Sequence, residues 1–243
     1  MAAPATGRQD VVLMAHLMRR AGFGASREEL ERRVAAGYDE TVDELLDFDR
    51  HPPVDEYLLY RYMPRIEVPG GGPAVIEGQT NWLYRMRVTE RPLEEKMVLF
   101  WHHVFATGHS KVDNCYEQLI QLNTFRRHCL GNFRDLLIAL AQDPAMIFWL
   151  DNNENHMRAP NENWGRELLE LFSMGVGSYT EDDVKQSARA FTGWTLEPKL
   201  PRNPYGREPW HFEYRAEDHD SGNKTLLGHS GDLNGEDAIE VVL

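Results

Sequence analysis

The segment from Pro160 to Phe172 constrains the fold of this chain more than any other stretch. It predicts a helix with Asn161 as its N-cap residue and an end near Gly175. At about 100° per residue, its polar side chains share one narrow stripe, and apolar side chains occupy most of the remaining circumference. The stripe consists of Asn163, Arg166, Glu167 and Glu170. A helix that is apolar over more than half of its surface is expected to be largely buried, so this stripe must face water, a polar cleft or an ion.

Two interpretations of the stripe remain open. In the first, it is a solvent-facing surface on which Asn163 pairs with Glu167 and Arg166 with Glu170, because residues four apart are neighbours on a helix. In the second, it is one wall of a site. Glu167 and Glu170 could then bind a hard cation or act as an acid and a base, and Arg166 could hold an anionic group of a substrate.

Composition places the chain among ordinary globular proteins. It has 243 residues, of which 42% are hydrophobic and 27% charged, enough for one large domain or two small ones. A formal net charge of -13 argues against nucleic acid or an anionic membrane as a partner and favours cations, basic partners or simple solubility. No stretch approaches the roughly eighteen apolar residues of a membrane span, and no signal peptide is visible. We therefore expect a cytoplasmic protein, unless an export signal once preceded this sequence.

Helical periodicity and capping signals predict a mainly α fold. Pro92 is placed to begin a strongly apolar helix. Asn132 is placed to cap a helix over 133–141, and Thr180 to cap a helix that ends at Gly193. The two cysteines, Cys115 and Cys129, fall on one predicted helix about 20 Å apart, so they are expected to be free thiols.

We interpret the chain as a single helical domain with four parts. These are N-terminal helices within 10–50, a central helical core at 76–193, an irregular or hairpin segment at 194–230 and the start of a helix at 235–243. The last helix has a start signal and no stop signal, which suggests C-terminal truncation. Within the third part, prolines at 198, 201, 204 and 209 indicate an irregular excursion, and the segments 211–214 and 224–228 are predicted to pair as a small hairpin.

The sequence lacks the common catalytic motifs. It contains no glycine-rich phosphate-binding motif, no Gly-x-Ser-x-Gly, no Cys-x-x-Cys and no His-Glu-x-x-His. Nucleotide-dependent, thiol-based and zincin-type chemistries are therefore disfavoured. Polar residues outside the stripe form two further groups that need an explanation.

The first group is His102 and His103 on the apolar helix. Adjacent helical residues point about 100° apart, so both imidazoles cannot easily bind one ion. His102 is either a hydrogen-bonded core residue or a ligand. The second group is the glycine-containing loop with His211, His219, Asp220 and Lys224. It suits metal ligation or acid/base work. Alternatively, it is a simple hairpin turn with His219 exposed and Lys224 solvated.

Several longer motifs occur in a characteristic order along the chain. They are His16–Gly24, Lys96–His102 with Phe105–Thr107, Asp143–Met146 with Leu150–Asn152, Pro160–Asn163 with Arg166–Phe172, Tyr179–Glu181, Ala190–Trp194, His219–Asp220 and Lys224–Thr225. In this combination the chain resembles the large bacterial family known as domain of unknown function 1800, and the resemblance covers nearly the whole sequence. Many members carry a second histidine two positions after the one matching His102, where this chain has Val104. Members are also typically longer, and many look exported.

The resemblance implies no established activity, but it singles out a set of polar residues. They are His102, Asn161, Glu162, Asn163, Arg166, Glu167, Glu170, His219, Asp220 and Lys224. This set overlaps the groups found from the residues themselves. Ionisable side chains that dominate a family's motifs indicate a site, although a buried ion-pair network would look similar.

Two functional hypotheses follow, and the sequence leaves open whether the protein is an enzyme. In the first, a metal-assisted hydrolase-like site lies between the 161–173 helix, the 92–106 helix and the 219–224 loop. A divalent metal would be held by His102, Glu167, His219 and Asp220, with Glu162, Glu167, Arg166 and Lys224 in catalytic roles and Asn161, Asn163, Glu170 and His211 in support. In the second, the chain is a non-enzymatic scaffold or binding module, and the same residues form an internal network. A partner protein would be contacted through a missing C-terminal part. A bidentate pair at Arg166 with no adjoining pocket would favour the second hypothesis.

Overall fold

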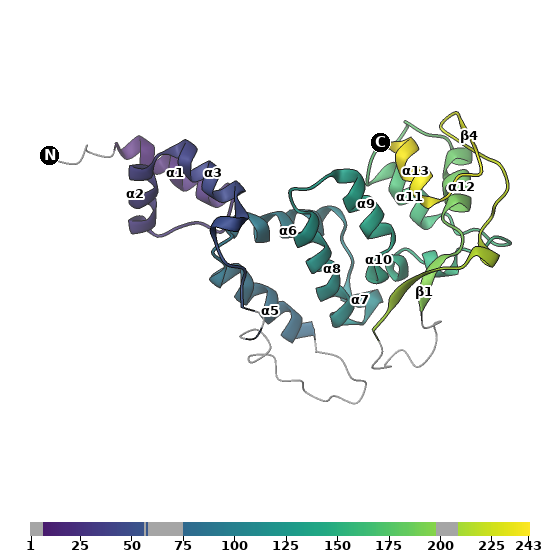
Figure 1. The fold of residues 1–243 in the computed structure, drawn as a ribbon, viewed down its shortest axis with the longest axis horizontal. Coiled ribbons are helices and arrows are strands. Elements are labelled where there is room, and N and C mark those ends of the chain that lie inside the picture. Colours follow the sequence, from purple (N-terminus) through teal and green to yellow (C-terminus); the bar gives the residue numbers. More distant parts are fainter. Residues whose placement is uncertain (1–6, 56, 58–74, 198–208) are drawn as a thin grey trace. The chain divides into compact units, whose positions relative to one another are not determined.

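Helices dominate the part of the chain that the structure describes, as the capping pattern predicts (Figure 1). The structure is a computed structural model that describes residues 7–55, 57, 75–197 and 209–243. Within these ranges the β structure consists of two small antiparallel sheets of two strands each and one isolated bridge. The described chain divides into two compact units, an N-terminal unit within Met1–Pro64 and Ile76–Phe100 and a C-terminal unit that includes Trp101–Leu243.

The N-terminal unit is built from short helices. They are α1 (Arg8–Arg20), α2 (Arg27–Ala36), α3 (Tyr38–Leu46), the 3₁₀ turn η1 (Phe48–Arg50), nearly all of α5 (Val75–Val88) and the first part of α6 (Pro92–Val104). Ser26 caps α2 by accepting a hydrogen bond from the Glu29 amide. The buried core joins the first three helices and consists of Val11, Met14, Met18, Leu30 and Leu45.

The C-terminal unit contains the remaining helices. They are α7 (His109–Val112), α8 (Cys115–His128), α9 (Phe133–Ala141), α10 (Pro144–Trp149), the 3₁₀ turn η2 (Asn152–Glu154), α11 (Asn163–Glu170), α12 (Glu181–Ala190), the 3₁₀ turn η3 (Ala216–Asp218) and α13 (Gly235–Val242). Asn132 and Thr180 cap α9 and α12 as predicted. Cys115 and Cys129 are buried free thiols, which confirms the prediction made from their spacing.

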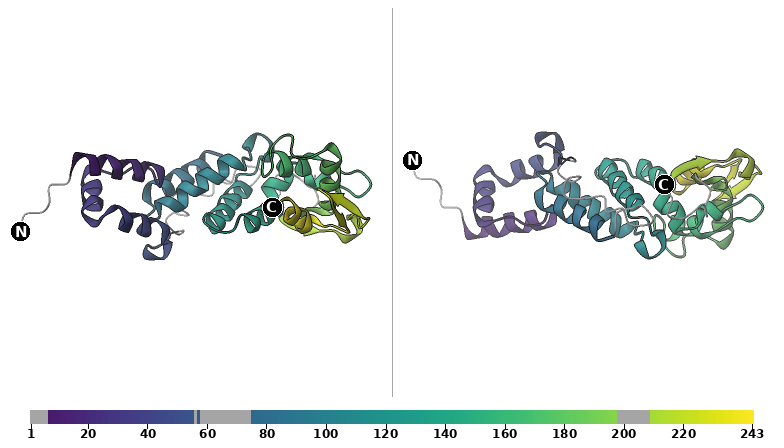
Figure 2. Two further views of the ribbon diagram at one scale, coloured as in Figure 1. Left: turned by 90° about the horizontal axis from the view of Figure 1, so that it is seen from above. Right: turned by 90° about the horizontal axis from the view of Figure 1, so that it is seen from below.

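Aromatic rings form the core of the C-terminal unit. Phe105 contacts Phe125, Phe133 and Phe172 with ring centroids 6.3, 6.3 and 4.9 Å away. A second run of ring contacts continues through Trp164, Phe191 and Trp194, with centroids 5.6 and 5.3 Å apart. Both views in Figure 2 show the green and yellow segments, which contain α11–α13 and the strands, gathered beside one another. The apolar majority of α11 is therefore a core surface, as its pattern predicts.

Helix α11 begins later than the sequence predicts. Its N-cap residue is Glu162, which makes no side-chain cap, whereas the Asn161 Oδ1 accepts the Asn163 amide at 3.0 Å. Asn161, the residue before the N-cap, thus supplies the capping side chain, and the predicted N-cap position is wrong by one residue. The helix ends at Glu170, before Gly175. Helices α11 and α12 approach each other closely at Gly165, where a Cβ would lie only 2.9 Å from the Ala188 nitrogen.

The strands do not pair as the sequence predicts. Strand β2 (His211–Tyr214) pairs with β1 (Trp194–Glu197), and β3 (Lys224–Leu226) pairs with β4 (His229–Gly231). The predicted hairpin between segments 211–214 and 224–228 is therefore wrong. Leu227 and Gly228 have φ angles of 49° and 85°, the conformation of a tight two-residue hairpin turn, so the chain reverses at once and β3 meets β4. Of the predicted proline-rich excursion, residues 198–208 lie outside the described part of the chain.

None of the described helices combines the length and the apolar character needed to cross a membrane.

Candidate functional site

Most side chains in the polar stripe of α11 form ion pairs or hydrogen bonds with neighbouring segments. Arg166 donates to both carboxylate oxygens of Glu181 at 2.9 and 2.7 Å, and its Nη2 also donates to Glu162 at 3.2 Å. Glu181 and Glu162 thus take the place of Glu170, the partner that helical spacing predicts. Glu170 instead accepts the hydroxyl hydrogen of Tyr179 at 2.6 Å. The bond from Arg166 lowers the pKa of Glu181, which is 69% exposed at its side chain.

Glu167 differs from the rest of the stripe. Its Oε2 is buried and has no hydrogen-bond partner among the described residues. Burial raises the pKa of Glu167, the nearby charge of Glu170 raises it further, and Arg166 opposes both. A carboxyl group with a raised pKa and an unused oxygen has the character of an acid/base group or a ligand.

The loop before β3 is tied to the C-terminal end of α12. Arg189 donates to both oxygens of Asp220 at 2.6 and 3.2 Å, and the Gly222 amide donates to Asp220 at 2.8 Å. His219 is 8% exposed, and its Nδ1 lies 2.8 Å from the carbonyl oxygen of Thr192, to which it donates. The bond from Arg189 lowers the pKa of Asp220 most, and the bond from the Gly222 amide lowers it further.

Lys224 is buried, with only 1% of the residue exposed. Its Nζ donates to the Gly222 carbonyl at 3.2 Å and to Asp232 at 3.4 Å. The interpretation of this loop as a simple turn with an exposed His219 and a solvated Lys224 is therefore wrong. Both side chains turn inward and hold the loop against the protein.

The two remaining histidines of the predicted site lie in different settings. His102 on α6 is half-buried, its ring makes a T-shaped contact with Phe125 at a centroid distance of 6.4 Å, and burial lowers its pKa. His211 is exposed on β2, opposite Glu197 in the β1–β2 pair.

Ion pairs of two predicted residues, Arg166 and Asp220, lie at opposite ends of α12. Arg166 pairs with Glu181 at the first residue of this helix, and Asp220 pairs with Arg189 eight residues later, about 12 Å along the axis. Within the described ranges, no three His, Cys, Asp or Glu residues are arranged to hold a metal ion. The ligand set His102, Glu167, His219 and Asp220 thus stays a prediction, and the geometry lends it no support.

Sequence reasoning missed an asparagine network behind α12. The Asn155 side chain donates to Asn152 at 3.1 Å and to the Ala188 carbonyl at 2.8 Å, and it accepts the Asn161 amide at 2.9 Å. Asn152 donates in turn to the Trp194 carbonyl at 2.8 Å. The dense run of asparagines at 152–155 was the available signal, because an amide both donates and accepts.

A His–Asp pair was also missed. His156 Nδ1 lies 2.5 Å from Asp218 Oδ2, and the Met157 amide donates to the carbonyl oxygen of Asp218 at 3.1 Å. The two residues are 62 positions apart, and neither carries a motif that would connect them from sequence.

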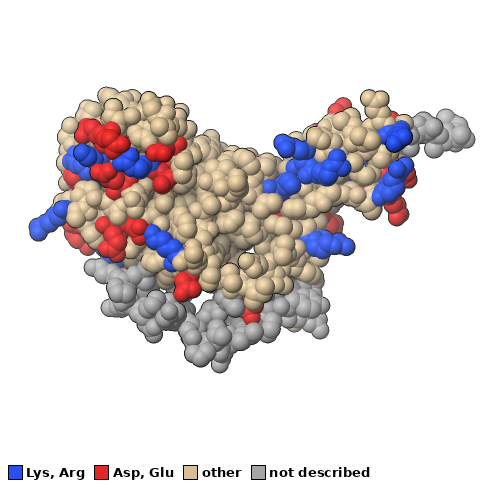
Figure 3. All heavy atoms as spheres, turned by 180° about the vertical axis from the view of Figure 1, so that it is seen from behind, with Lys and Arg blue, Asp and Glu red and all other residues tan. Residues whose placement is uncertain are grey.

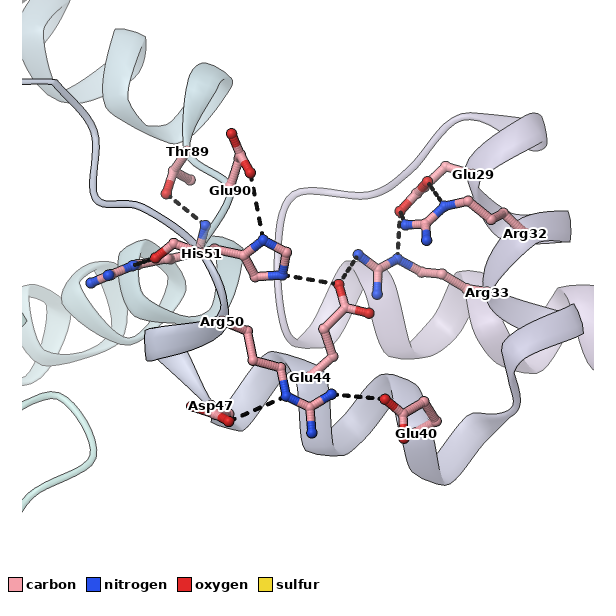
Figure 4. Close-up of polar contacts among 11 residues, drawn as sticks. Glu29, Arg32, Arg33, Glu40, Glu44, Asp47, Arg50, His51, Thr89 and Glu90 are labelled. Atoms are coloured by element: carbon pink, nitrogen blue, oxygen red, sulfur yellow. Dashed lines mark hydrogen bonds and ion pairs between the residues drawn. The ribbon is translucent and has the colours of Figure 1, made fainter.

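The N-terminal unit holds a separate polar network, drawn in Figure 4. Arg33 donates to Glu29 at 2.6 Å and to Glu44 at 3.2 Å. His51 lies between Glu44 and Glu90, at 3.2 and 3.5 Å. The adjoining cavity of ≈ 10 Å³ has room for about one water molecule, so it cannot serve as a substrate pocket.

Comparison with known proteins gives one match. Residues 16–243 match a family described as "Protein of unknown function (DUF1800)". No curated protein and no solved structure matches the chain.

Proposed function

The chain belongs to the DUF1800 family, and we propose that it acts as a non-enzymatic helical scaffold or binding module that holds a protein partner. The observation that carries this proposal is the Arg189–Asp220 pair. Both Asp220 oxygens accept from the Arg189 guanidinium, and one of them also accepts from Gly222. A carboxylate whose oxygens are used in this way is positioned to hold a loop in place, and little of it is left for a metal or a substrate.

Helix α12 is fixed at both ends by the segment that follows β2. At its N-terminal end, Asp183 closes a capping box with Thr180 and also accepts the Leu227 amide at 2.7 Å. At its C-terminal end, Arg189 holds Asp220, and Thr192 Oγ1 accepts the Asp220 amide at 2.8 Å. We call this arrangement the α12 clasp, defined by Asp183, Arg189, Thr192, Asp220 and Leu227. It supports a structural role for residues that the sequence marks as a site.

The charge of the chain agrees with a protein partner. With a formal net charge of -13, the chain disfavours nucleic acid and favours a partner with basic groups. On the face drawn in Figure 3, the Lys and Arg side chains of the C-terminal unit are flanked by Asp and Glu side chains. Interspersed charges of this kind are typical of specific polar contacts and not of binding to a uniformly charged polymer.

The substitution Asp220→Asn tests the clasp. We expect it to lower the free energy of unfolding by about 2 kcal/mol, because the partly buried Arg189 loses its counter-charge while the shape of the side chain is kept. Denaturant unfolding followed by circular dichroism measures this loss. The matched control is Glu181→Gln, which removes the bidentate but exposed partner of Arg166 and should cost less than about 1 kcal/mol. Unchanged or increased stability in Asp220→Asn would contradict the proposal, since that is the usual result of replacing a residue kept for activity.

A metal-assisted hydrolase is the second candidate function, and Glu167 is the observation that favours it, because its buried Oε2 lacks a partner among the described residues. The ion would have to be divalent and bound by oxygen or imidazole ligands. Metal analysis of the purified protein and of Glu167→Gln separates the two candidates, with Glu154→Gln as an exposed control. On the scaffold proposal, all three proteins contain far less than one equivalent of metal. One equivalent that is retained in Glu154→Gln and lost in Glu167→Gln would favour the hydrolase instead.

A further inference from the structure

The small cavity of the N-terminal unit is bordered by the polar network drawn in Figure 4. Its volume is ≈ 10 Å³. The residues around it come from α2, from the C-terminal end of α3 and the segment that follows, and from the turn before α6, all within the N-terminal unit. They include Arg33, Glu44, Leu45, Phe48, His51 and Glu90.

Arg33 reaches this cavity with one hydrogen-bond donor group unused. The residue is only 7% exposed. Its Nε donates to Glu29 at 2.6 Å, and its Nη2 donates to Glu44 at 3.2 Å. Its Nη1 is buried and has no hydrogen-bond partner among the described residues. Buried polar atoms without partners are rare and destabilising, so Nη1 calls for an acceptor that no described residue supplies.

Glu44 places an acceptor group beside this unused donor. Its Oε1 accepts from Arg33 Nη2 and lies 3.2 Å from Nε2 of His51. Figure 4 shows Arg33 and His51 approaching the carboxylate from opposite sides. Because Nη1 and Nη2 belong to one rigid planar group, the unused donor lies close to the carboxylate that the other nitrogen reaches. A small molecule beside this pair can accept from Nη1 and donate to Glu44.

The end of α3 brings further acceptors to the same region. The last four carbonyl groups of a helix have no partner within the helix unless a turn continues it. Helix α3 ends at Leu46, so the carbonyl groups of Glu44 and Leu45 belong to its last turn, and both residues line the cavity. The cavity thus adjoins a buried donor, a carboxylate and the carbonyl end of a helix.

Volume and charge select the molecule that fits. A cavity of ≈ 10 Å³ is close to the minimum for one water molecule and is too small for an organic ligand. An anion would face the carboxylates of Glu44 and Glu90, and a metal cation would face the guanidinium groups of Arg33 and Arg91, all of which line the cavity. A neutral molecule that both accepts and donates meets neither conflict.

We propose that this cavity binds one ordered water molecule, which accepts a hydrogen bond from Arg33 Nη1 and donates one to the carboxylate of Glu44. The water completes the hydrogen bonding of the guanidinium group and bridges α2 to α3. His51 contacts the same carboxylate, and its carbonyl oxygen accepts from Arg91 Nε at 2.8 Å. The water is therefore part of a chain of hydrogen bonds that runs from α2 to the turn before α6, and it belongs to the folded structure as a side chain does.

The number of long-lived water molecules tests the proposal. Relaxation dispersion of ¹⁷O in water counts buried waters in solution, and we expect the count to fall by one in Arg33→Met, which removes every donor of this side chain but keeps a long stem. The matched control is Arg32→Met. Arg32 is the neighbouring residue on α2, its side chain is 60% exposed, and it pairs with the same Glu29 at 2.7 Å. This control should keep the count of the unaltered protein, and an undiminished count in Arg33→Met would overturn the proposal.

A measurement on the unaltered protein covers the case in which Arg33→Met fails to fold. The backbone amides of Leu45 and Phe48, two residues that line the cavity, should show nuclear Overhauser effects to water with the sign of a long-lived contact. The amide of Leu30, in the buried core of the same unit, should show none. A crystal structure should show a water at about 2.7–3.2 Å from Arg33 Nη1. Absence of the effect at both lining amides, or of this water in a crystal structure that shows other ordered waters, would contradict the proposal.

Discussion

Replacing Gly193 with alanine is expected to lower the free energy of unfolding by about 3 kcal/mol. Gly193 connects α12 to β1 with φ at 78°, a region in which a residue with a Cβ is strained by roughly 1–2 kcal/mol. An added Cβ would also lie 2.5 Å from the carbonyl oxygen of Arg215 and 3.2 Å from the His219 nitrogen. These are backbone atoms and cannot rotate away, so overpacking adds about 1–3 kcal/mol. The loss should appear as a lower denaturant midpoint with an unchanged slope.

Gly228→Ala is the matched control for this substitution. Gly228 has φ at 85°, and nothing lies within 4 Å of the position of its Cβ. Its substitution should therefore cost only the backbone strain of about 1–2 kcal/mol. The difference between the two variants isolates the close approach of Gly193 to the loop that carries His219. Equal losses in both variants would contradict the close contact of Gly193 with the backbone of Arg215 and His219.

A second large effect is expected for Asn155→Asp, which should cost about 3 kcal/mol at pH 7. The Asn155 amide group donates to Asn152 and to the carbonyl oxygen of Ala188 in a buried site. A carboxylate has no hydrogen to donate, so the substitution sets a buried charge against two acceptor oxygens. The loss should shrink as the pH falls toward 5, because a protonated carboxyl group regains one donor and its pKa in the folded state is raised by burial.

Asn123→Asp provides the comparison. Asn123 is exposed on α8, and its Oδ1 accepts from Arg126 at 2.5 Å. A carboxylate keeps this bond and adds charge to it, so stability should change by less than about 0.5 kcal/mol. Both variants are measured by denaturant unfolding at pH 5 and 7. A loss in Asn155→Asp no larger than that in Asn123→Asp would mean that the asparagine network does not hold the loop to α12.

Local features of the fold could be predicted from the sequence because their causes lie within a few residues. The caps at Asn132 and Thr180 depend on bonds to amides two or three positions away, and the start of α6 at Pro92 depends on the proline itself. The strand pairing could not be predicted in the same way. It depends on a positive φ at Leu227, a conformation that leucine rarely adopts and that no sequence rule assigns to it.

In the candidate site, too, the sequence predicts local features but not contacts between distant residues. The sequence identified Arg166, Asp220 and Lys224 as unusual, but it could not give their partners, since Arg189 lies 31 residues from Asp220. Burial was missed for the same reason. Glu117 and Asp143 look like ordinary residues at helix starts, and only the packing around α8 and α10 buries their side chains.

The α12 clasp also has a consequence for the order in which the protein can fold as it is synthesised. The residues that fix the two ends of α12 come later in the chain. Asp220 follows its partner Arg189 by 31 residues, and Leu227 follows its partner Asp183 by 44. Gly235, at the start of α13, packs so closely on Phe191 and Trp194 that a Cβ there would lie 2.7 Å from both rings. While the chain is still emerging from the ribosome, α11 and α12 therefore lack the contacts that complete their packing. The packing of α11 and α12 is completed only after Asp220, Leu227 and Gly235 have been synthesised, whereas the first three helices have their own core and can fold before that.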